Sequence, residues 1–203
     1  MLDRKNKVIS KLFKRIASRG SAWTLPFELI AGAGRFIRRK TSLTLWRLRG
    51  ITMGRYGHLG PGVRCADPKS VTMGIKVVLG GGVRLATETY QGRLWIGDGV
   101  EIGRHTILDF SGDLTIEEGA LVSESAIIYT HDHGYDPRSK PTASPLVLKR
   151  NCWIGSRAII LPSVNYIGEN AIIGSGAVVT KDVPDGHVYV AGPGRLLKRK
   201  DLN

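Results

Sequence analysis

Two histidines stand close together in a chain that has only five. They are His131 and His133 in the run YTHDHGYD, and Asp132 separates them. A neutral imidazole can take a proton from a reacting group near pH 7, or it can coordinate a metal ion. The run follows aliphatic and small residues and precedes GYDPRSKPTASP, whose Gly, Pro and Ser content predicts a loop. The pair is therefore a candidate for a catalytic base, for metal ligands, or for surface residues without a chemical role.

The elements that would position these histidines follow a repeat of six residues. From about residue 53 onward, aliphatic residues recur at this spacing in five runs: Met73, Leu79 and Leu85; Ile96, Ile102 and Leu108; Ile116, Val122 and Ile128; Leu148, Ile154 and Ile160; Ile167, Ile173 and Val179. Glycine often follows the aliphatic residue, as in IGDGVE and IGSGAV, and a small or β-branched residue stands four places on. A period of six fits neither an α-helix nor one long strand, whereas it is typical of a hexapeptide-repeat β-helix. An ordinary β-sandwich would show period two and irregular spacing.

In such a β-helix, three hexads form one triangular coil, and the aliphatic residues point into it. Coils stack at the strand spacing of about 4.8 Å. The spacing slips by two residues between Leu108 and Ile116, and by one at Tyr166. Between Ile128 and Leu148 lie 20 positions, which corresponds to an insertion of 14 residues. This inserted loop begins at the two histidines.

The coil arithmetic predicts which residues lie near them. Ile128 should stack over Leu108 on the third face of the coil, and His131 should then lie over Ser111. Asp109 is two residues along that lower strand, so it should lie within about 10 Å of His131. One acceptor molecule could therefore contact both Asp109 and His131.

The motifs around and after the loop support a family comparison. They are THDH, NCWIGSRAIILPSV, IGENAIIGSGAVVTKDVPDG and VAGPGRLLK. On these motifs, residues 53 to about 198 resemble the hexapeptide-repeat acyltransferases, in particular sugar O-acetyltransferases of the galactoside and maltose acetyltransferase type. The resemblance implies a left-handed parallel β-helix, acetyl-CoA as co-substrate and a sugar or polysaccharide acceptor. It also implies a homotrimer with active sites between subunits.

The resemblance assigns roles to individual residues. His131 would be the general base, and Asp109, His133 and Trp153 would contact the acceptor or the acetyl group. The residues that would bind coenzyme A are Ser156, Ser175, Thr180, Lys181, Arg195 and Lys198. The coil arithmetic puts Trp153 by the corner between the first and second faces, away from His131. These two residues could share a site only across a subunit boundary. Cys152 falls at a corner-filling position, and we interpret it as structural.

Other functions remain open at this point. His133 could replace His131 as the base. A γ-type carbonic anhydrase shares this fold and would need a third histidine, His105, which should lie away from His131. We expect His131 and His133 to project to opposite sides of an extended strand, which disfavours a shared metal ion, and we expect no metal cofactor. An N-acetyltransferase of an amino sugar, a xenobiotic acetyltransferase and a non-enzymatic β-helix scaffold are the alternatives.

The N-terminal segment, residues 1–50, differs from the repeats in residues 51–203. It holds 13 Lys and Arg against two acidic residues, a net charge of +11. Residues 4–19 predict an amphipathic helix, with an apolar stripe formed by Val8, Ile9, Leu12, Phe13 and Ile16. Residues 25–49 predict further helix with a break at Gly32–Gly34, and Gly50 is its expected C-terminal stop. The segment would bind an anionic membrane surface, or it would pack on the trimer or cap the β-helix.

The composition indicates where in the cell the chain is expected and which partners it is not expected to have. No apolar run approaches the roughly 20 residues of a membrane span, and no secretory signal peptide is evident. The two cysteines, Cys65 and Cys152, form neither a disulfide framework nor a CxxC motif. No aromatic stacking motif for nucleic acid is present, so we expect no nucleic-acid partner. These features predict a cytoplasmic protein, either free or peripheral at the inner face of the membrane.

Overall fold

The structure, a computed structural model, describes residues 43–192. The chain divides into two compact units, Met1–Ser42 and Leu43–Asn203, and all of the described residues belong to the second. The expected helix at residues 4–19, most of the helix at 25–49, and Arg195 and Lys198 lie outside the described residues. Within residues 43–192, no helix is both long and apolar enough to span a membrane.

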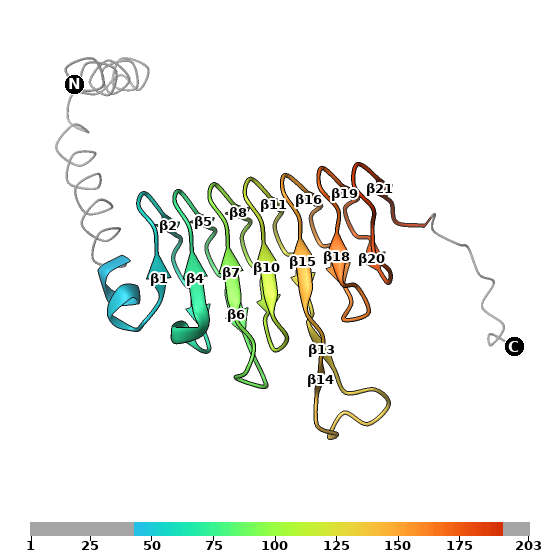
Figure 1. Cartoon of the computed structure of the whole chain (residues 1–203), viewed down its shortest axis with the longest axis horizontal. Coiled ribbons are helices and arrows are strands. Elements are labelled where there is room, and N and C mark those ends of the chain that lie inside the picture. Colours follow the sequence, from blue (N-terminus) through green and yellow to red (C-terminus); the bar gives the residue numbers. More distant parts are fainter. Residues whose placement is uncertain (1–42, 193–203) are drawn as a thin grey trace, which may run out of the picture. The chain divides into compact units, whose positions relative to one another are not determined.

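The described part is a parallel β-helix with three sheets as its faces. Figure 1 shows its coils side by side along the axis, with one hairpin projecting from them. The first sheet holds β1 (Thr52–Met53), β4 (Val71–Met73), β7 (Leu94–Ile96), β10 (Leu114–Ile116), β15 (Leu146–Leu148) and β18 (Tyr166–Ile167). The second sheet holds β2 (His58–Leu59), β5 (Val78–Leu79), β8 (Glu101–Ile102), β11 (Leu121–Val122), β16 (Trp153–Ile154), β19 (Ile172–Ile173) and β21 (Val188–Tyr189). The third sheet holds β3 (Arg64–Cys65), β6 (Arg84–Ala86), β9 (Ile107–Asp109), β12 (Ile127–Ile128), β17 (Ile159–Ile160) and β20 (Val178–Val179).

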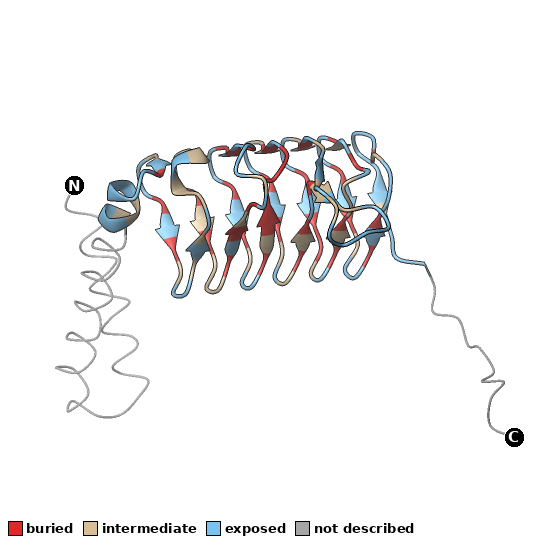
Figure 2. Cartoon of the chain, turned by 90° about the horizontal axis from the view of Figure 1, so that it is seen from below, coloured by how far each residue is buried: buried red, intermediate tan, exposed pale blue. Residues whose placement is uncertain are grey.

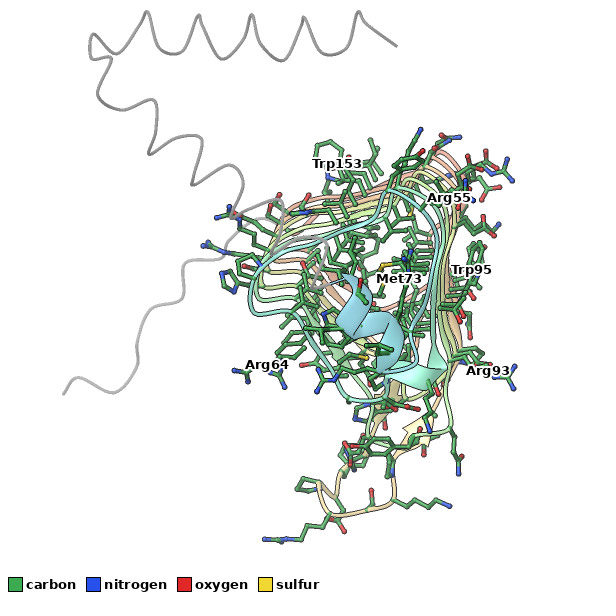
Figure 3. All side chains as sticks on the ribbon, turned by 90° about the vertical axis from the view of Figure 1, so that its left-hand side faces the viewer. Arg55, Arg64, Met73, Arg93, Trp95 and Trp153 are labelled. Atoms are coloured by element: carbon green, nitrogen blue, oxygen red, sulfur yellow. The ribbon has the colours of Figure 1, made fainter. Side chains whose placement is uncertain are left out.

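The six-residue repeat places its aliphatic residues inside the prism, as predicted. Leu108, Ile128 and Ile160 are 0% exposed and stack in register on the third sheet. Figure 2 shows buried residues recurring from coil to coil, and Figure 3, viewed along the axis, shows Met73 pointing into the interior. Cys152 is also fully buried, and burial raises the pKa of its thiol to about 12. The structural interpretation of Cys152 is thus confirmed.

The glycine that follows the inward aliphatic residue allows neighbouring coils to approach each other. Gly103 illustrates the reason, because a Cβ atom built there would lie 2.3 Å from the backbone nitrogen of Glu124 in the next coil. No side chain could occupy that space without moving the backbone. The recurrent Ile-Gly pair is therefore one inward side chain followed by one close contact between coils.

A short helix covers the first coil. Residues 43–48 are helical, and Leu43 and Trp46 pack against the hydrophobic core. The Arg47 guanidinium donates hydrogen bonds to the carbonyls of Met53 and Gly54, each at 3.2 Å. Residues 43–48 therefore pack on the β-helix, whereas the expected amphipathic helix at 4–19 lies outside the described residues.

The repeat is interrupted at one corner of the prism. The inward residues are more than six positions apart after Leu85, Leu108, Ile128 and Ile160, and each of these four lies in a strand of the third sheet. Consecutive coils put their extra residues at the same corner, where the chain passes to the first sheet. The longest insertion forms the hairpin of β13 (His131–Asp132) and β14 (Thr142–Ala143). This corner, which we call the loop corner, holds the candidate site.

Burial predicts the cost of truncating a core side chain. Ile128→Ala should lower the free energy of unfolding by about 2–5 kcal/mol, because the narrow prism cannot collapse around the cavity. Ile75→Ala is the matched control, since Ile75 is 43% exposed and should cost about 1 kcal/mol or less. Urea unfolding of both variants measures the difference. Equal costs would contradict the packing described here.

Candidate active site

The loop corner brings His131 and Asp109 together. Asp109 ends β9, and His131 begins β13 one coil further on. The Nδ1 atom of His131 lies 2.8 Å from Oδ2 of Asp109. The proximity predicted from the coil arithmetic is confirmed, and the contact is a direct hydrogen bond.

Asp109 is held by donors on both of its oxygens. Oδ1 accepts the hydroxyl of Ser111 at 2.6 Å, and Oδ2 accepts the backbone N–H of Thr130 at 2.7 Å. Burial by itself would raise the pKa of Asp109, but the hydrogen bonds from Ser111, Thr130 and His131 outweigh it and lower the pKa below its ordinary value. Asp109 is therefore an ionised carboxylate that is 3% exposed.

This carboxylate fixes the tautomer of His131. An ionised carboxylate only accepts hydrogen bonds, so Nδ1 of His131 carries the hydrogen. The neutral ring then has its lone pair on Nε2, which points away from Asp109. Such a ring is ready to take a proton at Nε2, because its orientation and its tautomer are both set by the buried partner.

Glu88 is part of the site and was missed in the sequence analysis. Its Oε2 atom lies 3.1 Å from Nε2 of His131 and 3.4 Å from Nε2 of His133. Its backbone N–H donates to the hydroxyl of Ser111, which in turn donates to Asp109. Glu88 follows the inward residue Leu85, where the repeat is also interrupted. The stacking of interruptions at one corner is the sequence signal that could have found it.

His133 lies on the same side of the hairpin as His131. Their ring centroids are 5.4 Å apart. The expectation of opposite sides is wrong, because residues two apart in an extended strand point to the same face. Nδ1 of His133 donates to the carbonyl of Ser139 at 2.8 Å, and this hydrogen bond, together with Glu88, raises the pKa of His133.

The expected coenzyme A residues lie on both edges of the third sheet. Thr180 and Lys181 follow β20, so they lie at the loop corner, two coils beyond the start of the hairpin. Ser156 and Ser175 lie at the opposite edge, in turns that precede β17 and β20, and the N–H of Gly176 donates to the carbonyl of Ser156. One chain therefore brings Thr180 and Lys181, but not the two serines, to the corner of His131.

Trp153 is far from the histidines in the same chain. It projects outward from β16 on the second sheet and is 47% exposed. Figure 3 shows it on the side of the prism away from the pale yellow hairpin. Its ring N–H donates to the hydroxyl of Ser123 at 2.9 Å. Trp153 was predicted to lie by the corner between the first and second faces, but it lies in a strand of the second sheet. It is separated from His131, as predicted.

His105 does not complete a three-histidine site. It lies in the turn between the second and third sheets, where its backbone N–H donates to the carbonyl of Gly81. The loop corner is at the other edge of the third sheet. The described residues therefore do not place the three histidines of the carbonic anhydrase alternative together within one chain.

Comparison with known proteins identifies homologous acetyltransferases. No protein-family model matches the chain. A galactoside O-acetyltransferase of Escherichia coli is 29% identical over 112 residues, which are 50% of this chain and 55% of the relative. A second Escherichia coli protein, named for O-acetyl transfer in lipopolysaccharide biosynthesis, is 24% identical over 143 residues, 64% of this chain and 72% of the relative. The alignments span about half the length of the first curated relatives.

Solved structures share the β-helix. The N-acyltransferase AntD of Bacillus cereus, in complex with dTDP and 3-hydroxybutyryl-CoA, has a TM-score of 0.64 at 22% identity. The match covers 77% of this chain and 87% of AntD. At this identity the likeness establishes the fold. The chain is thus similar in sequence to acetyltransferases and in fold to acyltransferases.

Proposed function

We propose that this chain transfers an acetyl group from acetyl-CoA to a hydroxyl group of a sugar, with His131 as the general base. The observation that carries the proposal is the hydrogen bond from His131 to the buried, ionised Asp109. It leaves Nε2 as the proton acceptor, on the side of the ring that faces Glu88. The names of the relatives, which include galactoside and lipopolysaccharide O-acetyltransferases, support a sugar acceptor.

The chemistry is a direct transfer. An alcohol has a pKa far above 7, so it attacks the thioester carbonyl only as its proton leaves. Nε2 of His131 takes that proton as the oxygen–carbon bond forms. The tetrahedral intermediate then expels the coenzyme A thiolate, which takes the proton back from His131. The products are an acetyl ester and coenzyme A, and the imidazole returns to its neutral form.

Asp109 has a positioning role in this scheme. Its two oxygens accept hydrogen bonds from Ser111, Thr130 and His131, and its side chain is buried. Contact with the acceptor, which the family resemblance assigned to Asp109, is replaced in our proposal by orientation of the imidazole and stabilisation of the imidazolium ion. The acceptor would contact Glu88 and His133, which are at the open side of the site.

Coenzyme A would lie along the third sheet. Thr180 and Lys181 are on the same edge as His131, about two strand spacings or 10 Å along the axis. An extended pantetheine arm can span that length. Ser156 and Ser175 line the other edge with small side chains. The donor to the oxyanion would be a backbone N–H or the hydroxyl of Ser156. Arg195 and Lys198, outside the described residues, would bind the phosphates.

An acetyl-CoA turnover screen tests the function. Free coenzyme A is measured with a thiol reagent while free and lipid-linked oligosaccharides are supplied as acceptors, with amino sugars as a separate set. Turnover with hydroxyl acceptors supports the proposal, and turnover with amino sugars alone would replace it with N-acetylation. The absence of turnover with every acceptor would favour the scaffold alternative.

We expect three chains to assemble, because one chain separates Trp153 and Ser156 from His131. Exposed apolar side chains also stack along the second sheet: Leu121, Trp153, Ile172 and Val188. Light scattering should give three times the mass of the chain. Trp153→Arg should lower that mass, whereas Trp95→Arg on the first sheet, where Trp95 is 44% exposed, is the matched control. A fully active monomer would contradict this proposal.

We also expect the N-terminal segment to bind anionic membranes. Residues 1–42 hold 11 Lys and Arg against two acidic residues, a net charge of +9. Each basic residue near such a surface adds about 1 kcal/mol of attraction, which salt weakens. The full chain should co-sediment with anionic liposomes at low salt, and a chain that begins at Leu43 should not. Aggregation of the shortened chain would instead indicate that the segment packs on the protein.

A further inference from the structure

The two histidines of the hairpin present one nitrogen each to the same carboxylate oxygen. Nε2 of His131 and Nε2 of His133 lie 3.1 Å and 3.4 Å from Oε2 of Glu88. The possible ligand atoms of the three side chains all lie within 4.8 Å of one another. These side chains come from two interruptions of the repeat that meet at the loop corner.

Hydrogen bonds to other partners occupy both Nδ1 atoms and leave Nε2 of each ring facing Glu88. Nδ1 of His131 is bonded to Oδ2 of Asp109 and Nδ1 of His133 to the carbonyl oxygen of Ser139, each at 2.8 Å. Both partners accept, so both Nδ1 atoms carry hydrogen, and each neutral ring has its lone pair on Nε2. The two Nε2 atoms therefore face the same carboxylate oxygen, Oε2 of Glu88, at hydrogen-bonding or ion-pair distance. One cation placed among these three atoms would contact all of them, because the possible ligand atoms lie within 4.8 Å of one another.

The spacing suits a tetrahedral metal ion. Zn²⁺ binds imidazole nitrogen and carboxylate oxygen at about 2.0–2.2 Å, so adjacent ligand atoms in a tetrahedron lie about 3.3–3.6 Å apart. The separations from Glu88 Oε2 are 3.1 Å and 3.4 Å. Histidines that bind a metal usually donate their other N–H to a carboxylate or a carbonyl, and Asp109 and Ser139 supply both kinds of acceptor.

We propose that Glu88, His131 and His133 form a binding site for a divalent transition-metal ion of the Zn²⁺ type, with the fourth position open to water. The side chain of Glu88 is 50% exposed, so an ion can reach the site from solvent. The metal would bind to the lone pair of His131 that accepts the proton in acetyl transfer. Bound metal therefore inhibits the transfer; this consequence rests on the proposed function, whereas the binding itself does not.

Metal binding is tested first without an activity assay. The tag-free full chain is stripped with a chelator, and Zn²⁺ is titrated against a chromophoric chelator. Co²⁺ replaces Zn²⁺ for visible absorption. We expect one Zn²⁺ per chain and the intense absorption of four-coordinate Co²⁺. Glu88→Gln and His133→Gln should each weaken Zn²⁺ binding more than tenfold, because even loss of a supporting hydrogen bond costs about 10–100-fold.

Two exposed residues away from the hairpin provide matched controls. Glu101→Gln on β8 and His187→Gln before β21 remove the same chemical groups and should leave Zn²⁺ binding unchanged. No binding by the unaltered chain, or equal binding by the Glu88→Gln and His133→Gln variants, would overturn the metal site.

Inhibition is tested second. Zn²⁺ should abolish acetyl transfer over the same concentration range in which it binds, and a chelator should restore it. Zn²⁺ that binds at this site without lowering the turnover of an active chain would overturn the inhibitory role. The outcomes separate the two proposals. If the chain binds Zn²⁺ but transfers no acetyl group, the metal site stands and the proposed function fails. If the chain transfers acetyl groups but binds no Zn²⁺, the proposed function stands and the metal site fails.

Discussion

His131→Ala is expected to lower kcat by about 10²–10⁴-fold, which is the range for loss of a general base. His133→Ala should lower it much less. Only His131 is bonded to the buried carboxylate of Asp109, whereas the Nδ1 atom of His133 is bonded to a backbone carbonyl. The two rings are close enough that each could reach a bound hydroxyl group. The test therefore depends on which ring has an ionised partner to stabilise its protonated form.

Initial rates at saturating acetyl-CoA and varied acceptor separate the two roles. Loss of the base lowers kcat, whereas loss of an acceptor contact raises KM. Circular dichroism and thermal unfolding should match the unaltered chain, because both histidines lie on the hairpin outside the prism. If His133→Ala shows the larger loss of kcat, then His133 is the base and Glu88 is its carboxylate partner.

The fold follows from the sequence because one rule repeats. Each inward residue stacks on the one a coil away, so the register of Leu108, Ile128 and Ile160 can be counted directly. The same count predicted that Asp109 lies near His131. Backbone spacing alone gives that distance, which is why no knowledge of the side chains was required.

Glu88 could not be placed in the same way. It belongs to an interruption, where the six-residue count fails and the chain follows local hydrogen bonds. The N–H of Glu88 donates to Ser111, and the hydroxyl of Thr89 donates to the carbonyl of Ser111. These side-chain contacts determine where the carboxylate lies, and no sequence period describes them.

The same distinction explains the error about His131 and His133. The six-residue count correctly placed the strand of His131 on the third face. The prediction that the two rings project to opposite sides was wrong, because residues two apart in a strand point to the same face. It also treated the loop as irregular, whereas β13 and β14 pair as a hairpin, with His131 opposite Ala143. Trp153 was separated correctly because it lies within the regular repeat.

Asp109→Asn is expected to lower kcat by about 10²–10⁴-fold, comparable to the loss of the base, although Asp109 touches no substrate. The side-chain amide of asparagine accepts hydrogen bonds only at its oxygen, whereas its NH₂ group donates. If its NH₂ group faces His131, the ring must accept at Nδ1 and carry its hydrogen on Nε2, so the base has the wrong tautomer. If its NH₂ group faces Ser111, the tautomer survives but the negative charge that stabilises the imidazolium ion is lost.

The variant should also be less stable at neutral pH. Either orientation sets the NH₂ group against a buried donor of Ser111 or Thr130, and an unsatisfied buried donor costs about 1–3 kcal/mol. Asp113→Asn is the matched control, since Asp113 is exposed and accepts the backbone N–H of Arg93 at 2.9 Å without touching His131. It should change kcat little.

The pH dependence of the free energy of unfolding shows whether the negative charge of Asp109, and not only its packing, stabilises the fold. Its pKa is lowered in the folded chain, so the ionised group stabilises the fold fully above the unfolded pKa of about 3.9, and the effect is lost as the pH falls through the lower folded pKa. The unaltered chain should thus lose this stability below about pH 4. Asp109→Asn has no such group, so its free energy of unfolding should fall less steeply over the same range, as urea unfolding at pH 7, 5, 4 and 3 would measure. Parallel pH curves for the two chains, together with an unchanged kcat, would remove Asp109 from the proposed mechanism and leave it a structural residue of the loop corner.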